Sequence, residues 1–586
     1  MKFTVKGTTR RLKFKLALAT LLLASTSSIV LCSNTTEKLR KINQVSVSDF
    51  GAIPDDGKND EEQLRKAIDY CRLNPGTKLL WAPGVYNFKD EEAVQLMKDC
   101  MSGKFGANPQ DHTFTYNFKY IIGLNFNGVH DLTIEATGAT MLCDGWMEPL
   151  SLNNCSNVKI TGLKIDYKRK PHSTGTIVNV QPDWFDVAYD KMYPMDSTMS
   201  LCRTAVWNVK AGRQDMRFGE DYSPPFKMIA PQKLRVLRKI DPSAVGNLLF
   251  TPHSFHFRPA ILIHEAKNIK LVDVTIHSQP GMGIVGHRSE NITMIGLHIV
   301  PSAGWIQSTN TDATHFTSCK GLIRYEDCQI EGQGDDGANI HSYYNYIQKP
   351  AKGPGYDLVV KNADLHAQKL DYPDLGDTLE LVNAKTLEVV KKVVVRTRVN
   401  NYEEKRTQVT LDKELHADIE NYYLINVTRL PRVEIVGCVF AHNRARGVLI
   451  KTRNVTVERC LFLECTGTPV HVGAEGNWHE GPGSTNVIIR NNRMIRCGGG
   501  AGDIGSCGVT VNGGETVGIH KNILIEGNII ESDNGDNGMN LENIDGITVR
   551  YNEFAVSGNP YVISRSANVK IYSNQGAVNK IEQEVK

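Results

Sequence analysis

The stretch Asn522-Ile523-Leu524-Ile525 decides the fold of this 586-residue chain, because it returns as Gly546-Ile547-Thr548-Val549 and as Asn568-Val569-Lys570-Ile571. The three copies start 24 and 22 residues apart, and apolar residues alternate after the first position of each. Alternating apolar residues are typical of short strands that bury one face. Such strands, repeated every 20–30 residues or so without a helical pattern, indicate a β-solenoid.

The same motif occurs about ten times along the chain. The other copies begin at Asn157, Asn268, Asn291, Gly321, Arg432, Asn454 and Asn486. The predicted fold class is therefore all-β, with a parallel β-helix. In such a helix, positions one period apart in sequence become neighbours about 4.8 Å apart on adjacent coils.

Residues 45–88 predict a cap on the first coil. A strand at 45–48 is followed by helical apolar spacing over Glu61–Arg72 and by a strand at 79–86. A terminal helix covers side chains and strand edges that a solenoid would otherwise expose. The segment resembles the N-terminal cap of the pectate-lyase-like superfamily, which implies a right-handed helix, through Asp49-Phe50-Gly51-Ala52, Asp56-Gly57 and Pro83-Gly84-Val85-Tyr86.

Two gaps of 111 residues interrupt the repeat, from 157 to 268 and from 321 to 432. Because one ordinary coil needs only 22 residues or so, each gap has room for a small domain. Strand-like runs inside both gaps predict two inserted β-barrels, which close their own sheet edges. The expected organisation is a secretory signal at 1–32, cap and first coils at 45–165, a first barrel at 166–257, central coils at 258–346, a second barrel at 347–422 and final coils at 423–586.

The first 31 residues predict export. Six basic residues precede the short apolar run 16–24, which is a signal-peptide pattern too short to span a membrane. Subtracting these six charges from the formal net charge of +3 leaves −3, which argues against a nucleic-acid partner. The expected location is the periplasm or the outer membrane or cell surface of a bacterium. Cys32 is a candidate for lipidation, and the sequence leaves a membrane lipid anchor open.

Cys328, Cys438 and Cys460 fall at the same place in their repeats, seven, six and six residues after the motif start. Stacked coils would bring the three thiols into one column. Free cysteine commonly behaves as a small buried apolar residue, and the chain has no zinc-like cysteine spacing. We therefore expect a column of buried free thiols, in preference to disulfides or a metal site.

The coil between the two gaps holds the strongest candidate active site. Asp312, in Asn310-Thr311-Asp312-Ala313-Thr314-His315, precedes Asp335 by 23 residues, and Asp336 follows directly. Stacking would bring three carboxylates together, so that repulsion keeps a proton on one beside an ionised partner. Glycoside hydrolysis uses such a pair. An isolated Asp-Asp-Gly is more often a solvated turn, as expected at 55–57, but the spacing from Asp312 favours a site.

The next two coils add candidate substrate-binding residues. Alignment on the preceding apolar residues sets Arg446 under Asp336 and Lys451 under His341. These pairs are equally well explained as structural ion pairs and as groups that orient a carboxylate or bind sugar hydroxyls. Trp478, in a Gly-rich loop, offers an apolar face to a hexose. The predicted substrate-binding residues are His315, His341, Arg446, Lys451, His471, Glu475 and Trp478.

Asn310-Thr311-Asp312 followed by Asp335-Asp336 resembles the active site of polygalacturonases, although Ala313 stands where those enzymes have Gly and their Gly-His-Gly element is absent. The cap, the interrupted helix and both motifs together are similar to glycoside hydrolase family 110, the bacterial α-1,3-galactosidases. These enzymes remove terminal galactose from B-antigen-type and linear α-galactosyl glycans. The resemblance covers nearly the whole chain after the signal.

What the resemblance implies is an inverting exo-galactosidase without metal or cofactor, acting on an oligosaccharide or glycoconjugate through Asp312, Asp335 and Asp336. The predicted roles are Asp312 as general acid and the other two as a pair that holds and deprotonates water. Inverting carboxyl groups are typically about 6.5–9.5 Å apart. Directly stacked side chains would be closer than this, so the mechanism requires a diagonal pair or splayed rotamers.

Three other functions stay open. A polygalacturonase-like polyuronide hydrolase predicts a basic groove along several coils. A non-catalytic adhesin or glycan-binding solenoid predicts that Asp336→Asn changes nothing. A lyase predicts Ca²⁺ at the carboxylate cluster. The sequence also leaves undecided whether substrates are fucose-branched or linear, which Asp is the acid, and whether the inserts form a homodimer.

Overall fold

The structure is a computed structural model that describes residues 43–114, 118–359, 371–502 and 504–576. The predicted signal at 1–32 and the candidate lipidation site Cys32 lie outside the described residues. Within the described ranges, no helix is both long enough and apolar enough to cross a membrane.

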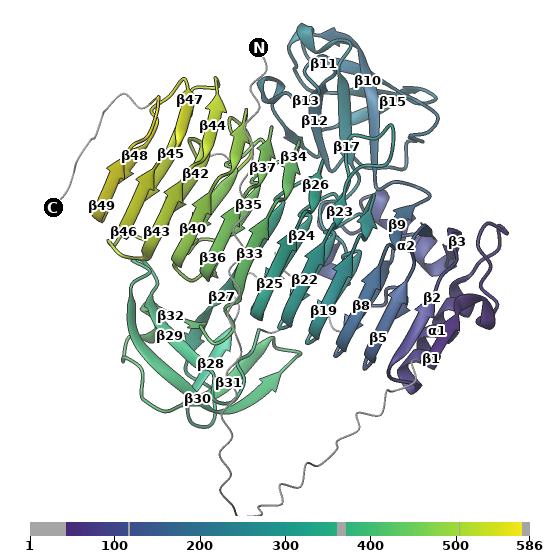
Figure 1. Ribbon diagram of the computed structural model, residues 1–586. Coiled ribbons are helices and arrows are strands. Elements are labelled where there is room, and N and C mark those ends of the chain that lie inside the picture. Colours follow the sequence, from purple (N-terminus) through teal and green to yellow (C-terminus); the bar gives the residue numbers. More distant parts are fainter. Residues whose placement is uncertain (1–42, 115–117, 360–370, 503, 577–586) are drawn as a thin grey trace, which may run out of the picture. The chain divides into compact units, whose positions relative to one another are not determined.

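The predicted repeats form consecutive rungs of one parallel sheet (Figure 1). Its 13 strands lie side by side in chain order, and the ten predicted copies occupy its last ten positions. The strands are β1 (Asn43–Ser46), β2 (Thr77–Leu80), β5 (His130–Glu135), β8 (Ser156–Thr161), β19 (Lys267–Val272), β22 (Glu290–Ile295), β25 (Lys320–Glu326), β33 (Arg432–Val436), β36 (Arg453–Glu458), β40 (Thr485–Arg490), β43 (His520–Glu526), β46 (Ile544–Arg550) and β49 (Ala567–Tyr572).

A second parallel sheet of 11 strands forms another face of the solenoid. Most of its strands are short because each spans only one side of a coil. They are β3 (Gly84–Lys89), β6 (Ala139–Asp144), β9 (Lys164–Tyr167), β20 (Thr275–Ile276), β23 (His298–Ile299), β26 (Gln329–Glu331), β34 (Val439–Ala441), β37 (Leu461–Leu463), β41 (Arg493–Ile495), β44 (Ile529–Ser532) and β47 (Glu553–Val556).

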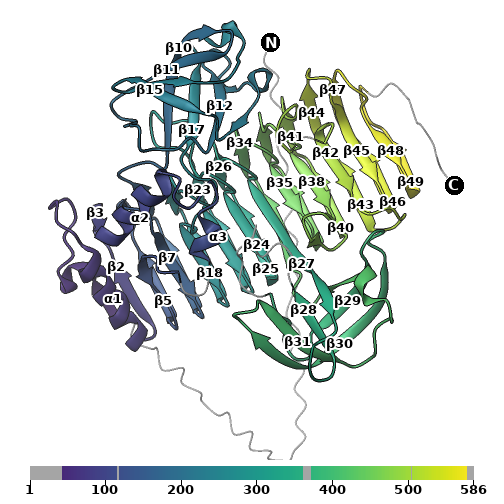
Figure 2. The same cartoon turned by 180° about the vertical axis from the view of Figure 1, so that it is seen from behind.

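A third parallel ladder completes the coils and is seen from behind in Figure 2. Apolar side chains of all three faces meet in one continuous interior, which confirms the predicted parallel β-helix. The strands of this ladder are β4 (Ile122–Asn125), β7 (Glu148–Asn153), β18 (Ile261–His264), β21 (Ile284–His287), β24 (Thr314–Thr317), β27 (Ala338–Gln348), β35 (Val448–Ile450), β38 (Val470–Gly473), β42 (Ser506–Asn512), β45 (Asn537–Glu542) and β48 (Val562–Ser564).

The asparagine that opens most repeats has a backbone role. At seven of these positions φ lies between 53° and 61°, the left-handed region that Asn tolerates better than most residues. Its side chain also bonds to the coil before it: Asn291 donates to Asn268 (3.0 Å), and Asn268 donates to Asn157 (2.9 Å). The asparagine therefore both turns the chain and links successive coils.

One copy of the motif is out of step with the prediction. Ile323 pairs with Ile292, and Tyr325 pairs with Met294, so these two residues of β25 face the interior. A motif that begins at Gly321, as predicted from the sequence, would have buried Leu322 instead. A register shift between Glu290 and Ile292 accounts for the extra residue.

The cysteine prediction is confirmed for the described residues. All twelve cysteines in that part of the chain are free and buried. Cys438 lies between Cys328 and Cys460 in the interior, as the shared repeat position requires. The column packs as small apolar side chains.

The cap contains the predicted helix, α1 (Glu61–Leu73), which buries Leu64, Ala67, Ile68 and Cys71. The strand expected at 79–86 is in fact two strands, β2 and β3, which belong to different sheets. Pro83 lies at the corner between them, where it needs to donate no ladder hydrogen bond. Two helices were not predicted, α2 (Glu91–Met101) and α3 (Gln110–Thr113).

The first insert was expected to be a closed barrel, but it is an antiparallel sheet around a core of its own, in which the edge strands β13 and β15 do not pair with each other. Its hydrogen-bonded order is β13-β12-β17-β10-β11-β16-β15, with β14 paired to β12. The elements are β10 (His172–Gln181), β11 (Trp184–Tyr189), β12 (Arg203–Asn208), β13 (Arg213–Gln214), η2 (Met216–Phe218), β14 (Asp221–Tyr222), β15 (Phe226–Ala230), β16 (Lys233–Val236), η3 (Pro242–Ala244) and β17 (Leu248–Pro252).

The second insert is a small closed barrel. Its antiparallel pairs run β27-β28-β31-β30-β29-β32 and return from β32 to β27. Strand β27 therefore leaves the solenoid and enters the barrel without a break. The remaining elements here and in the cap are β28 (Tyr356–Val359), β29 (Thr378–Asn383), β30 (Val389–Asn401), β31 (Arg406–Leu411), η4 (Ile419–Asn421), β32 (Tyr422–Asn426), η1 (Val47–Phe50) and, after the barrel, β39 (Glu480–Gly481).

The return to the solenoid differs from the expected position. Coils were expected to resume near Tyr423, but β32 contains this residue and still belongs to the barrel. The ladder resumes at β33, whose first residue is Arg432. Alternating apolar residues look alike in a barrel strand and in a coil strand, so the sequence pattern does not mark the change.

A second asparagine ladder, inside the coils, gives a stability test. Asn528 donates to the Ile489 carbonyl (3.0 Å) and to Asn552 (2.9 Å), and it accepts from the Asn492 backbone (3.0 Å). We expect Asn528→Ala to lower the free energy of unfolding in urea by roughly 2–4 kcal/mol, because buried polar groups lose their partners.

The control is Asn522→Gly on the exposed ladder. Asn522 makes an exposed hydrogen bond to Asn486 (3.2 Å), and glycine keeps its left-handed backbone free of strain. We expect its effect to stay within about 1 kcal/mol. Equal losses for the two variants would contradict a special role of the buried ladder.

Candidate functional site

Three predicted residues lie in register at one corner of three successive coils. Thr314 of β24 pairs with Ala338 of β27, which pairs with Val448 of β35. Two residues before these strands stand Asp312, Asp336 and Arg446. Asp336, rather than Asp335, is therefore the residue directly stacked on Asp312, and the period at this point is 24 residues.

The stacking brings the predicted carboxylates together. Asp312, Asp335 and Asp336 each offer an oxygen within 4.8 Å of the others. In addition, the Asp336 backbone N–H donates to Asp312 Oδ1 (3.3 Å). The predicted cluster is thus present, and its three members differ in burial and in partners.

Asp312 is a buried carboxyl group of the cluster whose side-chain partner is a histidine. Its Oδ2 lies 2.7 Å from Nδ1 of His315, and its side chain is buried. Burial raises the pKa of Asp312 to about 7, against the opposing hydrogen bond and charge of His315. A carboxyl group with this pKa holds its proton below pH 7 and loses it above.

Asp336 forms a two-pronged ion pair with Arg446, as the alignment predicted. Arg446 Nε donates to Oδ1 (2.8 Å), Nη2 donates to Oδ2 (2.9 Å), and the Arg446 backbone N–H donates to Oδ1 (2.9 Å). Only 3% of the Asp336 side chain is exposed. Burial raises the pKa of Asp336 above its ordinary value, although the charge of Arg446 opposes this.

Asp335 is the open member of the cluster, with 30% of its side chain exposed. Arg444 lies 3.3 Å from it and is held from the other side by the first insert. There, Arg444 Nε donates to Glu220 (3.0 Å), and Nη2 donates to the hydroxyl of Tyr222 (2.8 Å). The first insert thus fixes the arginine that faces Asp335.

A buried lysine extends the ion pairs into the next coil. Lys451 is fully buried, and its ammonium contacts both Glu475 and Glu480. Burial acts to lower the pKa of Lys451, but the two glutamates outweigh this effect and the pKa is raised. Arg446 lies 3.4 Å from Glu475, so charges alternate without a break from Asp336 to Glu480.

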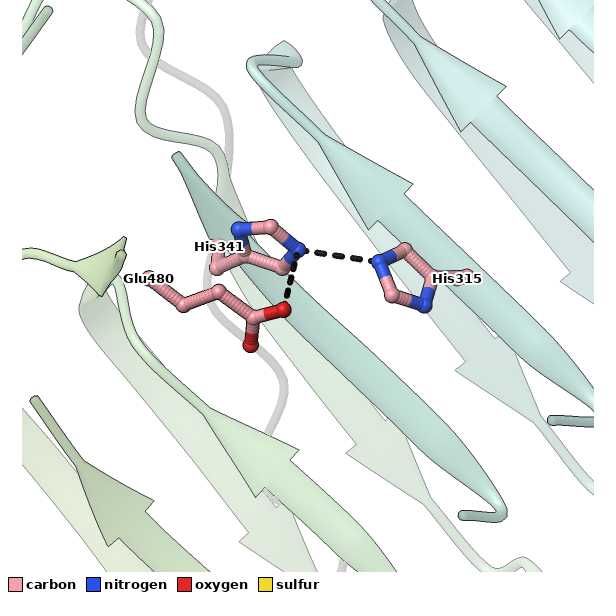
Figure 3. A group of neighbouring side chains, drawn as sticks. All are labelled: His315, His341 and Glu480. Atoms are coloured by element: carbon pink, nitrogen blue, oxygen red, sulfur yellow. Dashed lines mark hydrogen bonds and ion pairs between the residues drawn. The ribbon is translucent and has the colours of Figure 1, made fainter. Parts of the chain in front are cut away.

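His315 and His341 connect Asp312 to Glu480, the last carboxylate of this chain of charges. Figure 3 shows the two histidines and Glu480. His315 Nε2 lies 2.9 Å from His341 Nε2, and His341 Nε2 lies 3.5 Å from Glu480 Oε1. His341 is fully buried, and burial lowers its pKa to about 3. Lys451 follows His341 in register, as predicted, since Ile340 pairs with Ile450.

The last two predicted residues lie further along the chain. Nε2 of His471 bonds to Asn512 (2.8 Å) rather than to a carboxylate. Trp478 is 46% exposed in the turn between Glu475 and Glu480, whose backbones bridge at the base of the hairpin. The hairpin therefore presents an aromatic surface beside the charged cluster.

Three contributors to the site were not among the predicted residues. Arg444 and Glu480 stand next to predicted residues in the sequence, so their charge was a usable signal. Glu220 is separated from Arg444 by 224 positions and belongs to the first insert. Only the folding of that insert onto the coil reveals its role.

The short spacing bears on the reaction's stereochemistry. The nearest oxygens of the three carboxylates lie within 4.8 Å, which is closer than the roughly 6.5–9.5 Å between the carboxyl groups of a typical inverting pair. The 4.8 Å limit applies to the nearest oxygens, and the whole carboxyl groups lie farther apart than these oxygens do.

Two groups have the residue types of a metal site, the three aspartates and His315, His341 and Glu480. In each group a cation of the chain already neutralises a carboxylate, Arg446 on Asp336 and Lys451 on Glu480. Carboxylates whose oxygens are taken up in this way suit an ion-pair network better than a metal centre.

Known proteins resemble this chain along most of its length. A family model described as "right handed beta helix region" matches residues 404–524. An alpha-1,3-galactosidase A of Bacteroides fragilis is 27% identical over 88% of this chain and 89% of its own. An alpha-1,3-galactosidase B of Bacteroides thetaiotaomicron is 26% identical over 80% of this chain and 77% of its own. These relatives confirm the resemblance that the motifs indicate.

Among solved structures, the mannuronan C-5 epimerase A-module of Azotobacter vinelandii is similar at 12% identity, with a TM-score of 0.39. The similarity covers 92% of this chain and all of that one.

The buried ion pair predicts a large stability difference between two arginines. Arg446→Met leaves Asp336 buried without its partner, so we expect the free energy of unfolding to fall by about 3–5 kcal/mol. Arg490→Met, which removes a surface pair with Glu458, should cost less than about 1 kcal/mol. Urea denaturation of both variants measures this, and similar losses would contradict it.

Proposed function

We propose that this homologue of the bacterial alpha-1,3-galactosidases is an exo-acting glycoside hydrolase. Its proposed substrates carry terminal α-1,3-linked galactose, in B-antigen-type or linear Galα1-3Gal glycans. The names of the relatives support a galactosidase. The observation that carries the proposal is a buried carboxylic acid, Asp312, with a pKa of about 7 beside two further carboxylates.

The charge balance of the site favours a neutral sugar. Arg444 is paired with Glu220 and Asp335, Arg446 with Asp336 and Glu475, and Lys451 with Glu475 and Glu480. A polyuronide hydrolase needs cations that are available to substrate carboxylates. Here all three cations already have carboxylate partners within the chain, which speaks against the polygalacturonase-like alternative.

In the proposed mechanism, Asp312 donates its proton to the departing glycosidic oxygen. Asp335 takes a proton from the attacking water, because it is the most exposed of the three carboxylates. Asp336, fixed by Arg446, holds that water in place. No step uses a metal or a cofactor. Inversion is what the family resemblance implies for this mechanism.

The first experiment is proton NMR of a reaction with a Galα1-3Gal oligosaccharide, following the anomeric signals from the first minutes. We expect β-galactose to appear first. Early α-galactose would instead support a retaining route, which a spacing near 5 Å suits. Cleavage of polygalacturonate without galactose release would favour the polyuronide alternative.

Replacing the proposed acid separates its role from that of the base. We expect Asp312→Asn to lower kcat/KM on Galα1-3Gal by roughly 10²–10⁴-fold, the usual contribution of general acid–base catalysis. The loss should be much smaller with an activated aryl galactoside, whose leaving group needs little protonation.

The control is Asp56→Asn, because Asp55-Asp56-Gly57 in the cap repeats the sequence Asp335-Asp336-Gly337 of the cluster but lies outside the site. This variant should keep full activity. Equal losses on both substrates with Asp312→Asn would contradict the assignment of Asp312 as the acid.

The pH dependence follows from the raised pKa of Asp312. A group with a pKa of about 7 holds its proton below that pH and loses it above. We therefore expect kcat/KM to fall as the pH rises through about 7. A profile that stays flat up to pH 9 would contradict a protonated Asp312 in the reaction.

Treatment with EDTA tests the lyase alternative. The proposed hydrolysis needs no metal, so the rate should stay unchanged after chelation and dialysis. Loss of activity that Ca²⁺ restores, with an unsaturated sugar as product, would instead support a lyase.

We further propose that the chain acts after export, in the periplasm or at the cell surface. The support is the signal pattern at the start of the sequence. Fractionation of cells, with metabolic lipid labelling of the wild type and of Cys32→Ala, distinguishes a lipid-anchored form from a free one.

A further inference from the structure

Asp312 is joined to His341 through His315, and the hydrogen bonds restrict where protons can sit. His341 Nδ1 lies 3.1 Å from the backbone carbonyl oxygen of Ser342. A carbonyl oxygen only accepts, so Nδ1 of His341 carries a proton. Burial holds His341 in its neutral form, with a pKa of about 3. Its Nε2 therefore has a lone pair and accepts.

The tautomer of His341 fixes that of His315. The two Nε2 atoms are 2.9 Å apart and the ring centroids 5.0 Å apart. The difference between these two distances nearly equals the sum of the distances from each ring centroid to its own Nε2 atom. The two rings therefore meet almost head to head. Because Nε2 of His341 accepts, Nε2 of His315 must donate.

The head-to-head contact also separates this pair from a metal site. Lone pairs that bind one metal ion point to a common position beside both rings. Here the two nitrogens point at each other. The Lys451 ammonium, which contacts Glu480, would in addition repel a metal ion.

One proton then remains for the contact between His315 Nδ1 and Asp312 Oδ2 (2.7 Å). The pair holds it either as a carboxylic acid facing a neutral imidazole or as a carboxylate facing an imidazolium. A third arrangement, a carboxylate facing the bare Nδ1 of a neutral His315, places two lone pairs against each other. The pair therefore resists losing its proton.

We infer that His341 is a positioning residue, which keeps the shared proton on the Asp312–His315 pair by fixing the tautomer of His315. His315 has the same positioning role and contacts Asp312, the proposed acid, directly. The inference deepens the proposed hydrolase and rests on it, since it assigns how the proposed general acid is kept loaded. When Asp312 gives its proton to the glycosidic oxygen, the carboxylate that remains is the form that the network disfavours, so the acid reloads readily.

The other charged groups around the pair are consistent with this role. Asp335 and Asp336 face Asp312, and their negative charge disfavours its ionised form. Glu480 and Lys451 face both histidines. Glu480 alone would draw a proton onto His341 Nε2, but Lys451 neutralises it from the other side. The lysine thereby helps His341 to remain an acceptor.

The test compares His341→Met with His341→Gln. Methionine fills the space but cannot accept strongly, so His315 becomes free to carry its proton on Nδ1 and to stabilise the ionised Asp312. We expect the pH at which kcat/KM falls on the alkaline side to decrease by about one unit. At pH values well below this fall, we expect little loss of kcat/KM. Glutamine places an amide oxygen near the position of Nε2, and should return the alkaline fall of kcat/KM toward pH 7.

The control is His520→Met. His520 is equally buried and bonds through both ring nitrogens, to the Asn512 carbonyl (2.8 Å) and the Ser484 N–H (3.2 Å). It belongs to β43, outside the site, and its loss should affect stability without moving the alkaline fall of kcat/KM. A uniform loss of rate at all pH values in His341→Met, with the alkaline fall at its original pH, would overturn the inference.

A second measurement does not depend on hydrolysis. Ring nitrogens of the ¹⁵N-histidine-labelled wild type are observed by NMR from pH 5 to 9, with assignments from the His315 and His341 variants. We expect His341 as the neutral Nδ1–H tautomer throughout. A His341 that carries its proton on Nε2, or that titrates in this range, would overturn the inference. If the NMR result is as expected but no galactoside is cleaved, the proposed function fails and the proton arrangement stands.

Discussion

Backbone hydrogen bonding between coils is the constraint on which the rest of this protein depends. Each parallel strand must satisfy its N–H and C=O groups on the coils before and after it, and this fixes the register to the residue. The pairing of β24, β27 and β35 sets Asp312, Asp336 and Arg446 one above another at a corner. A shift of one residue would send these side chains to the opposite face.

Stacking of like charges has an electrostatic cost, and the site offsets it with cations from later coils. Asp336 is buried directly against Asp312, and Arg446 satisfies both of its oxygens. The buried Lys451 likewise contacts two glutamates, Glu475 and Glu480. Asp312 has no such cation among its recorded hydrogen bonds and ion pairs, and its partner is a histidine. This difference explains why Asp312 keeps a proton, whereas Asp336 is held by a permanent positive charge.

Both inserts contribute to the site in addition to extending from the solenoid. The first insert supplies Glu220 and Tyr222, which hold Arg444 against Asp335. The second insert continues from β27, the strand that carries His341, so the barrel and this positioning residue share one backbone element. Both inserts are therefore connected to the site, the first through Arg444 and the second through β27.

Much of this could be predicted from the sequence, because a solenoid turns linear spacing into spatial neighbourhood. The repeated Asn-apolar motif predicted the parallel helix, the equal spacing of Cys328, Cys438 and Cys460 predicted the thiol column, and local alignment predicted the Arg446–Asp336 pair. The errors arose where the period changes, as at Gly321, where a bulge adds a residue, and at Tyr423, where a barrel strand has the same pattern as a coil.

Only the tertiary structure decided which groups are buried away from water and which contacts join the inserts to the coils. The sequence by itself determined the stacking of the coils to within one residue, and hence the carboxylate cluster, since both follow from local periodicity. It could not bring Glu220 to Arg444 across 224 positions, nor set the spacing of the carboxylates, nor show that His315 and His341 meet nitrogen to nitrogen. Those features depend on side-chain packing and desolvation, which are properties of the folded chain.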